Sequence, residues 1–539
     1  MVAAVTSWVL AATAFLARLF WEVAQLGAAG AVLTRILPWG AAELPGPLSA
    51  LLSILYMALS VYGSLFLRAV DVLLAGLRSL GWGLAPALAT TAPVTAPTWE
   101  QLDDELRDLQ SAADPIEHLL FNPSRARLRL FGSDNEENVR VVLWRDSAAW
   151  CPYCMKTQLF LEESRISYRV EWVNMSCYGD KRSDFLRISP RGLLPVAEID
   201  GEVICDSDRI LVRLGRLQEP CGEGPRLAPG VGDPQLEESL RCIDLAYALQ
   251  AAWLGWLRTP VNNASKEAAF CLALDEVDAA LASHEAEGPF MLGRFSVVEC
   301  HLTPILERAT ASLAYYKGFF VRGSGRWPYI QQWFEAMENR VSYRSLAGDF
   351  YTHAHDLPPQ VGSCARNGKG LACEAHVDGH QSSGAWLLPL PASDPYEAVI
   401  PPCPGSTSSD TSTHAARVEA AASLIKNYSA VTAFALRALA PPGLPPMRAE
   451  LADPNAAPAM GPSDADRFFV DCALRHVTAH LLHGEGSPLE QGALSPALES
   501  GFGGDAERWR ECLRYLQRRV GVPRDMGAGA ARQLRAHLG

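Results

Sequence analysis

Apolar residues dominate the first hundred positions of the chain, and charged residues are few there. The charged residues between Met1 and Trp99 are Arg18, Glu22, Arg35, Glu43, Arg68, Asp71 and Arg78. The run Leu44–Leu67 carries no charge, and about 20 apolar residues are enough for a helix to cross a bilayer core of ~30 Å. We therefore expect hydrophobic helices that anchor the chain in a membrane. A targeting presequence, a helical hairpin in the membrane interface and a buried helical pair of a soluble domain are the alternatives.

A linker separates this apolar segment from the remainder of the chain. Ala85–Pro97 is uncharged, contains proline and consists mainly of small residues, a composition typical of linkers. Acidic residues at helical spacing follow in Thr98–Leu109. Residues 1–97 are thus predicted to be a membrane-anchor or targeting segment with its linker, and residues 98–138 a helical lead-in to a soluble body.

Strand and helix patterns alternate through residues 139–220. Val139–Trp144 is rich in β-branched residues, which favour a strand, and apolar residues then recur at helical spacing in Met155–Ile166. The other elements predicted here are the strands Tyr168–Val173, Val196–Ile199 and Glu202–Cys205, a short helix around Phe185–Ile188, and a helix at Asp208–Leu217. This order, βαβαββα, predicts an α/β domain.

Helical periodicity continues without strands through residues 230–360. The predicted helices are Leu236–Leu257, Ser265–His284, Ser296–Tyr316 and Pro328–Asn339. The third begins with Ser296 and Glu299 at the spacing of a capping box, in which each residue bonds a backbone amide of the other. Residues 361–413 are predicted to be an irregular linker because they include the polar, proline-containing stretch Pro401–Ser412. Residues 414–539 are predicted to be a helical extension with helices at Ala415–Ala440, Asp464–Leu482 and Asp505–Val520.

Composition and charge exclude several classes of protein. The chain has 539 residues, of which 49% are hydrophobic and 20% charged, so it can bury a sizeable core and is not disordered throughout. The formal charge of −13 argues against a general nucleic-acid binder, which needs clustered Lys and Arg for phosphate contacts. Thirteen cysteines in a chain of this length are too sparse for a disulfide scaffold.

The candidate chemistry lies in a Cys-Pro-Tyr-Cys sequence at the first strand-to-helix turn. Cys151 stands at or before the first helical residue, and Cys154 follows one turn later. The unpaired amides and the dipole at a helix N-terminus stabilise a thiolate and lower its pKa. We therefore predict that Cys151 is the nucleophile and that Cys154 can resolve a mixed disulfide. Half of a zinc site and a buried inert pair of thiols are the alternatives.

These motifs together resemble the cysteine-type glutathione transferases, which join a thioredoxin-fold N-terminal domain to an all-helical C-terminal domain. Leu194-Pro195 matches the cis-proline of that family, and Asp206-Ser207 matches the acidic residue and serine that hold the γ-glutamyl group. Lys181 stands where omega-like members place a lysine on the glycyl carboxylate. The resemblance implies that glutathione binds at Tyr153, Lys181, Leu194, Pro195, Asp206 and Ser207, and that no metal is required.

The sequence resembles one plant and algal glutathione transferase family more closely than the superfamily in general. Members of this family carry a C-terminal extension. The family is omega-, lambda- or dehydroascorbate-reductase-like, with a glutaredoxin-like CPYC turn, and many members are plastid-targeted. The matching segments are Trp150–Lys156, Glu162-Glu163, Ser176–Lys181, Tyr315–Gly318, Phe350–Gln360 and Val520–Leu538. The resemblance extends from about Thr98 to Gly539 and leaves the apolar N-terminal segment outside it.

The resemblance implies a glutathione-dependent thiol transferase or thiol–disulfide oxidoreductase with a cysteine nucleophile and glutathione as cosubstrate. The second substrate would be a glutathione mixed disulfide, dehydroascorbate, a glutathionyl-quinone or another small electrophile. The alternatives are a glutathione-binding module that shares an iron–sulfur cluster, and a non-catalytic membrane-attached scaffold with a vestigial glutathione site. We expect membrane association through residues 1–97, a plastid location and no nucleic-acid partner. A homodimer is a further candidate assembly.

Overall fold

The computed structural model describes residues 96–112, 125–132, 134–260, 263–380, 386, 409–439, 451, 462–484 and 506–539. The chain divides into two units, Met1–Ala89 and Thr90–Gly539, and every described residue belongs to the second. The predicted hydrophobic helices fall before residue 96 and so lie outside the described residues. Among the helices that are described, none combines the length and the apolar character needed to cross a membrane.

A five-stranded mixed sheet organises residues 128–204. The strand order is β1-β3-β2-β4-β5; β2 pairs parallel with β3, and the other neighbours are antiparallel. The strands are β1 (Leu128–Arg129), β2 (Val141–Asp146), β3 (Tyr168–Val173), β4 (Val196–Ile199) and β5 (Glu202–Ile204). The sequence did not reveal β1, because two residues are too short to show a period, nor the 3-10 turn η2 (Glu136–Asn138).

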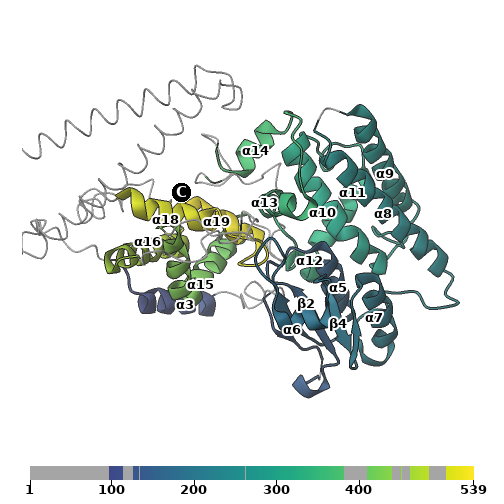
Figure 1. Ribbon diagram of the computed structural model, residues 1–539, viewed down its shortest axis with the longest axis horizontal. Coiled ribbons are helices and arrows are strands. Elements are labelled where there is room, and N and C mark those ends of the chain that lie inside the picture. Colours follow the sequence, from purple (N-terminus) through teal and green to yellow (C-terminus); the bar gives the residue numbers. More distant parts are fainter. Residues whose placement is uncertain are drawn as a thin grey trace, which may run out of the picture. The chain divides into compact units, whose positions relative to one another are not determined.

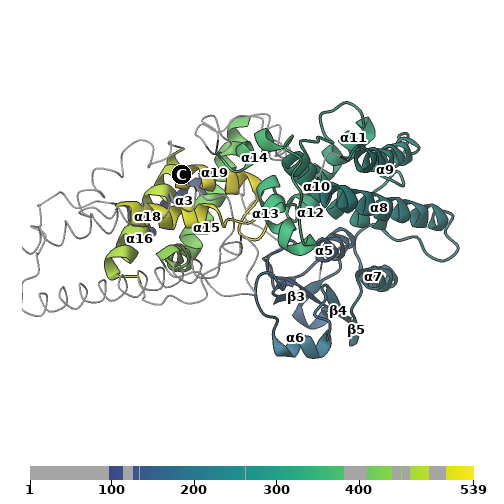
Figure 2. The same ribbon diagram turned by 45° about the horizontal axis from the view of Figure 1, so that its top comes forward.

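Helices cover both faces of this sheet. Figures 1 and 2 show α5 (Pro152–Ser164) and α7 (Ser207–Cys221) on one face and α6 (Ser183–Ile188) on the other. The residues between sheet and α6 form a small core of Trp144, Val173, Phe185 and Val196, whereas the opposite face joins a larger core shared with the helices that follow. The predicted order βαβαββα and the thioredoxin-like α/β arrangement are confirmed.

An all-helical part follows, with α10 at its centre. Every residue of α10 is buried, and Ser296 and Glu299 form the predicted capping box at its start. Figure 1 shows α10 among its neighbours and next to α5, with which it packs. The helices are α8 (Leu236–Leu257), α9 (Ala264–Ala282), α10 (Val297–Lys317), α11 (Pro328–Glu338), α12 (Val341–Arg344), α13 (Phe350–Val361) and α14 (Leu371–Val377).

A second hydrophobic core joins the two ends of the described chain. Helix α3 (Trp99–Ala112) packs against the C-terminal helices. The Trp99 ring stacks on Tyr428 with centroids 4.9 Å apart, and its Nε1 donates to Asp471 Oδ1 over 2.8 Å. The C-terminal elements are α15 (Ser409–Ala435), η3 (Leu436–Leu439), α16 (Asp464–His483), α18 (Ala506–Gln517) and α19 (Ala528–Leu538).

The predicted boundaries differ from the structure in three places. Residues 98–138 were expected to be a helical lead-in, whereas α3 ends at Ala112 and β1 and η2 lie further on. The stretch 361–413 was expected to be irregular, yet it contains α14 and the start of α15. Helices α13 and α19 were not predicted as helices, because prolines in the one and glycines in and before the other weaken the helical pattern.

Candidate functional site

The two cysteines of the Cys-Pro-Tyr-Cys sequence lie at the start of α5. Cys151 is the N-cap residue of this helix and Pro152 occupies its first position, where a missing amide hydrogen costs nothing. Cys154 follows within the first turn and is fully buried, and Cys151 keeps 8% of its surface exposed. The predicted placement of both thiols at a strand-to-helix turn is therefore confirmed, and Cys151 is the more accessible of the two.

The environment of the thiols separates their pKa values. The side-chain hydrogen bond from Cys154 is the main cause that lowers the pKa of Cys151, and the backbone amides of Cys154 and Tyr153 add to the lowering. Burial and the nearby Asp146 oppose it. Burial, followed by the hydrogen bond to Cys151, raises the pKa of Cys154 well above its ordinary value. Cys151 is thus the thiol that ionises first, and Cys154 is the proton-bearing partner.

Asp146 shapes the loop between β2 and α5. Its Oδ2 accepts hydrogen bonds from the backbone amides of Trp150 (2.6 Å) and Cys151 (3.0 Å). A carboxylate oxygen of Asp146 and the sulfur atoms of Cys151 and Cys154 lie within 4.8 Å of one another. Sequence reasoning missed this residue, although it ends the strand that leads into the thiol turn and could have been recognised from that position.

Asp146, Cys151 and Cys154 are also the three described side chains that could together hold a metal ion. Two thiolates and a carboxylate suit a thiophilic cation such as zinc. However, the Asp146 Oδ2 already accepts two amide hydrogens, so a metal at this oxygen would compete with the hydrogen bonds that build the loop. That no metal is required remains a prediction.

Lys181 lies near the thiols, but its ammonium is engaged with the backbone. Nζ donates to the Asn174 carbonyl over 2.6 Å. Burial lowers the pKa of Lys181, while negative charge on the Cys154–Cys151 pair acts in the opposite direction. Lys181 therefore interacts electrostatically with the thiol pair. This is the behaviour expected of a lysine that neutralises an anion bound beside the thiols.

The remaining predicted residues lie at the ends of β4, α5 and α7. Leu194-Pro195 is a cis peptide directly before β4, and Pro195 is buried. Asp206 is the N-cap of α7, where its Oδ1 accepts the amides of Asp208 and Arg209 at 3.0 Å each, and Ser207 is the first residue of that helix. Asp206 thus fulfils the role of a helix cap in this structure.

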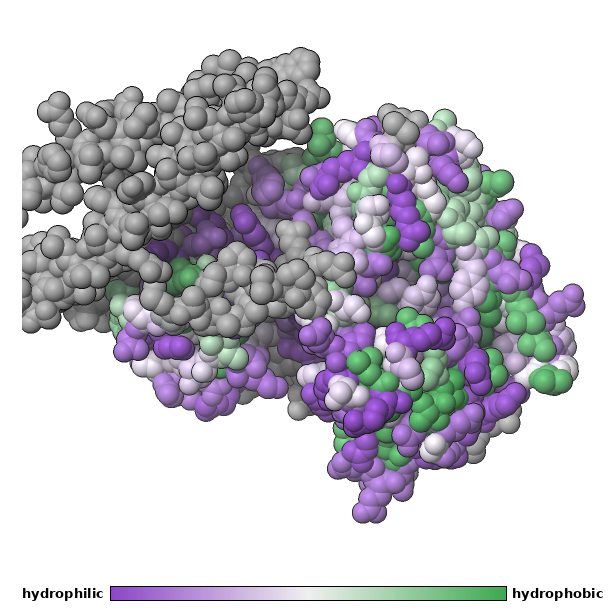
Figure 3. Space-filling view, viewed as in Figure 1, coloured by the Kyte–Doolittle hydropathy of each residue, from purple (hydrophilic) through white to green (hydrophobic). Residues whose placement is uncertain are grey.

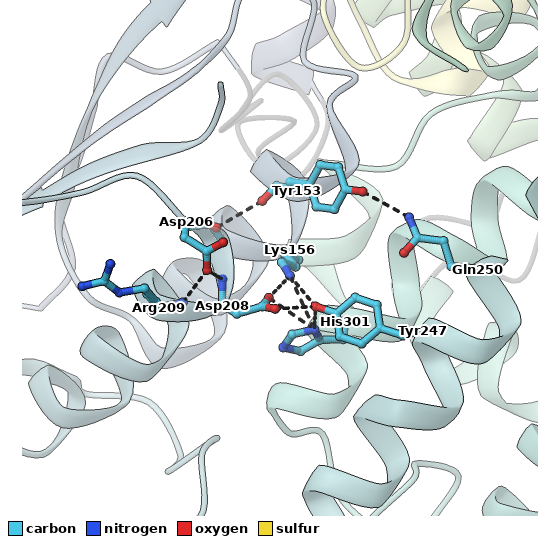
Figure 4. Close-up of polar contacts among 9 residues, drawn as sticks. Tyr153, Lys156, Asp206, Asp208, Arg209, Tyr247, Gln250 and His301 are labelled. Atoms are coloured by element: carbon cyan, nitrogen blue, oxygen red, sulfur yellow. Dashed lines mark hydrogen bonds and ion pairs between the residues drawn. The ribbon is translucent and has the colours of Figure 1, made fainter. Parts of the chain in front are cut away.

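Tyr153 is an exposed aromatic residue among those predicted, with 43% of its surface accessible. Figure 4 shows it beside Asp206, with its hydroxyl turned toward Gln250 of α8. The Gln250 amide donates to that hydroxyl over 3.3 Å. An exposed aromatic ring next to the start of α7 can form one wall of a ligand site.

A partly buried polar cluster behind α5, which sequence reasoning missed, joins the α/β part to the helical part (Figure 4). Lys156, one turn after the thiols, forms an ion pair with Asp208, and its Nζ lies 3.3 Å from the Tyr247 hydroxyl and 3.5 Å from His301 Nδ1. Burial, and then the charge of Lys156, lowers the pKa of His301 to about 4. His301 is therefore neutral near pH 7, and the cluster holds the two parts together.

Comparisons with known proteins agree with this architecture. Residues 150–217 match the N-terminal domain of the glutathione S-transferases, and residues 243–346 match their C-terminal domain. The chain is 28% identical over 196 residues to the glutathione S-transferase DHAR2 of Arabidopsis thaliana, which covers 36% of this chain and 83% of that protein. It is 27% identical over 200 residues to the chloroplastic glutathione S-transferase DHAR3 of the same plant, with coverages of 37% and 69%.

Among solved structures, the dehydroascorbate reductase of Chlamydomonas reinhardtii is similar at 22% identity and a TM-score of 0.31, over 39% of this chain and 93% of that one. The part of the chain between residues 150 and 346 is therefore similar to the glutathione S-transferases in both of its domains. The plant proteins to which it is similar carry the name glutathione S-transferase DHAR.

Proposed function

We propose that this protein is a glutathione-dependent thiol transferase in which Cys151 is the nucleophile. The observation that carries the proposal is the position of Cys151 at the N-cap of α5, where a hydrogen bond from Cys154 and two backbone amides lower its pKa. A thiolate is the nucleophilic form of cysteine. A serine or tyrosine type of transferase, which stabilises the thiolate of glutathione by a hydroxyl, would not need this arrangement.

The proposed reaction removes glutathione from a mixed disulfide. The Cys151 thiolate attacks the glutathione sulfur, a new S–S bond forms, and the substrate sulfur leaves as a thiolate that takes up a proton. The thiolate of a second glutathione then attacks the Cys151–glutathione disulfide, releases oxidised glutathione and restores Cys151. Cys154 offers a second route, in which it loses its proton and displaces glutathione to form a Cys151–Cys154 disulfide that further glutathione reduces.

We place glutathione across the residues that the resemblance assigns. Asp206 and Ser207 would bind the γ-glutamyl group, the backbone of Leu194 before Pro195 would pair with the cysteinyl part, and Lys181 would neutralise the glycyl carboxylate. The electrostatic coupling of Lys181 to the two thiols and the exposed ring of Tyr153 beside Asp206 support this placement.

Dehydroascorbate is the electrophile that we propose beside glutathione mixed disulfides, because the sequence resembles dehydroascorbate-reductase-like glutathione transferases and the similar plant proteins carry the names DHAR2 and DHAR3. Two glutathione molecules would supply the two electrons and become oxidised glutathione, while dehydroascorbate becomes ascorbate.

We also propose a plastid location, which the chloroplastic relatives support.

A homodimer is the assembly that we propose, because apolar side chains are exposed on the α/β part. Figure 3 shows hydrophobic residues gathered on the surface over the sheet and its helices. Exposed apolar side chains of these elements and their loops include Leu186, Leu193, Val203 and Val212. Sedimentation equilibrium would give twice the monomer mass, and a monomer at micromolar concentration would contradict this assembly.

The test of the function compares single cysteine variants on a glutathionylated peptide and on dehydroascorbate. Cys151→Ser should reduce kcat at least a thousandfold because no other described thiol occupies the helix N-cap. Cys154→Ser should keep much of the activity, since free glutathione can resolve the intermediate. Equal losses in the two variants would refute the assignment. Visible absorbance of the purified protein would instead support the iron–sulfur alternative, and failure to bind immobilised glutathione would support the scaffold.

A further inference from the structure

Helix α13 lies beyond the family match, yet it contacts the loop that carries Cys151. The C-terminal domain match ends at residue 346, and α13 begins at Phe350. Trp150 directly precedes Cys151, and its indole Nε1 donates to His353 Nδ1 of α13 over 3.1 Å. Both side chains are buried. The neighbour of the nucleophile is therefore held by a helix that is not part of the matched domains.

The hydrogen-bond partners fix the protonation of His353. An indole N–H only donates, so Nδ1 must accept and the ring proton stands on Nε2. That nitrogen lies 2.6 Å from Glu307 Oε1 on α10, a carboxylate oxygen that can accept it. Arg308, the next residue of α10, donates to the Trp150 carbonyl over 2.5 Å. Trp150 is thus held through its side chain and through its backbone.

The same helix also contacts the loop that leads to Lys181. The Tyr178 hydroxyl donates to Asp356 Oδ1 of α13 over 2.6 Å, and the Gln360 amide donates to Cys177 Sγ over 2.6 Å. One helix therefore touches both loops in which the thiols and Lys181 reside.

The C-terminal segment holds the first turn of α13 from the other side. Asp349 is the N-cap of α13, and its Oδ2 forms an ion pair of 2.5 Å with Arg535 of α19 in which neither side chain is exposed. The amide of Val522 donates to Thr352 Oγ1 over 3.0 Å. A buried charge that loses its partner is strongly unfavourable, so the place of this turn depends on the C-terminal helix.

We propose that His353 is a positioning residue for Cys151, and that the C-terminal extension acts on the thiol site by fixing α13 through the Asp349–Arg535 ion pair. The inference rests on the proposed role of Cys151 and gives the extension a function. The contacts run from Arg535 to Asp349, along α13 to His353, and from there to Trp150 beside the nucleophile. Stabilisation of a thiolate depends on donors held in place before the reaction, and a displaced Trp150 would misalign Cys151 with the donors on α5.

The first test measures alkylation of Cys151 at pH 6 in the full-length protein, with mass spectrometry to identify the modified residue. Trp150→Phe removes the indole donor. His353→Gln keeps an amide that can reach Glu307 but lacks an acceptor at the position of Nδ1, whereas His353→Asn keeps that acceptor. We expect about tenfold slower alkylation for Trp150→Phe and for His353→Gln, as for a tenfold smaller thiolate fraction, and a change of less than threefold for His353→Asn.

The double variant Trp150→Phe with His353→Gln completes a mutant cycle. Because both substitutions remove the same hydrogen bond, the double variant should be no slower than either single variant. Fully additive losses, or wild-type rates in all folded variants, would overturn the positioning role of His353.

The second test asks whether the C-terminal helix acts at a distance. Arg535→Gln removes the buried charge, and Arg467→Gln makes the same chemical change at an exposed position of α16. We expect Arg535→Gln to slow alkylation at pH 6 about tenfold and to lower kcat more than it raises KM for glutathione. Arg467→Gln should stay within twofold of the wild type, and Arg535→Lys should recover part of the loss.

The second test gives an answer even if a substitution unfolds part of the protein. If Arg535→Gln unfolds the C-terminal helices, as circular dichroism would show, slower alkylation still supports the coupling and an unchanged rate contradicts it. The alkylation rate does not require that the protein be an enzyme. Full activity of Cys151→Ser would therefore refute the proposed function, whereas an inactive Cys151→Ser with wild-type alkylation in His353→Gln and Arg535→Gln would refute only this inference.

Discussion

Asp146 has two opposite effects on the thiol site. By accepting the amides of Trp150 and Cys151, its carboxylate directs the chain from β2 into α5 and so sets Cys151 at the helix start. Its negative charge at the same time opposes ionisation of Cys151 and raises the pKa of Cys154. The residue that builds the loop therefore also limits how much thiolate is present.

Asp146→Asn should separate these effects. The amide oxygen of asparagine can still accept a backbone hydrogen bond, but the charge is gone, so the pKa of Cys151 should fall further. We expect alkylation of Cys151 at pH 6 to become about two- to tenfold faster, consistent with the loss of one nearby like charge. Asp146→Ala, which also loses the acceptor, is the control for loop structure. A slower rate in Asp146→Asn would show that loop geometry outweighs charge.

Local sequence was sufficient to predict part of this site and insufficient for the remainder. Cys151, Cys154 and Pro152 could be placed because a β-branched run followed by helical spacing fixes a strand-to-helix turn within a few residues. The partners of that turn from α10 and α13, Arg308 and His353, are separated from it by about 150 to 200 residues. No local period reports such a contact, because it depends on how the helices pack.

Helix α13 carries a buried carboxyl group whose ionisation opposes folding. Burial raises the pKa of Asp356 to about 7, although the hydrogen bond from Tyr178 acts in the opposite direction. The folded state therefore holds this proton more tightly than the unfolded chain, whose Asp pKa is ~3.9. The stabilising contribution is complete below about pH 4 and is lost as the pH rises through about 7.

Asp356→Asn should remove this pH dependence, since its amide keeps an acceptor for the Tyr178 hydroxyl but cannot ionise. Relative to the wild type, the variant should gain stability between pH 5 and pH 8, by up to ~3 kcal/mol at ~1.4 kcal/mol per pH unit. Thermal unfolding at the two pH values measures the difference. Burial also raises the pKa of Glu299 to about 7. Glu299 makes the same pH-dependent contribution to the free energy of unfolding in the wild type and in the variant, so its effect cancels in the difference. A variant that differs equally from the wild type at both pH values would contradict the raised pKa.

At the scale of the whole molecule, a helical bundle made from both ends of the described chain accompanies the two domains that match the glutathione S-transferases. The core of that bundle includes Trp99, Leu102 and Leu106 of α3 together with residues of α15, α16, α18 and α19. Sequence periodicity found α3 and most of the C-terminal helices separately. It could not show that they share one core, because amphipathic patterns do not say which apolar faces meet.

The segment before this bundle leads to a prediction about membranes. The charge-free run Leu44–Leu67 is long enough to span a bilayer, and each central Leu or Ile favours insertion by about 0.3–0.6 kcal/mol. Full-length protein should sediment with membranes and resist extraction with alkaline carbonate. A fragment that starts at Thr98 keeps α3 and should remain in solution and active. Release of the intact full-length chain by carbonate would show that the segment is no membrane anchor.

The complete burial of helix α10 predicts how fast its backbone amides exchange hydrogen for deuterium. All of its residues are buried, and it packs against α5, α8, α13 and α14, so its amides can meet solvent only when several surrounding helices separate. Deuterium should therefore enter α10 last, at a rate that reports opening of the whole domain. The slowest-exchanging peptide would then contain Glu307 and Arg308, and its rate in any variant would tell a loss of global stability from a local change at the thiols.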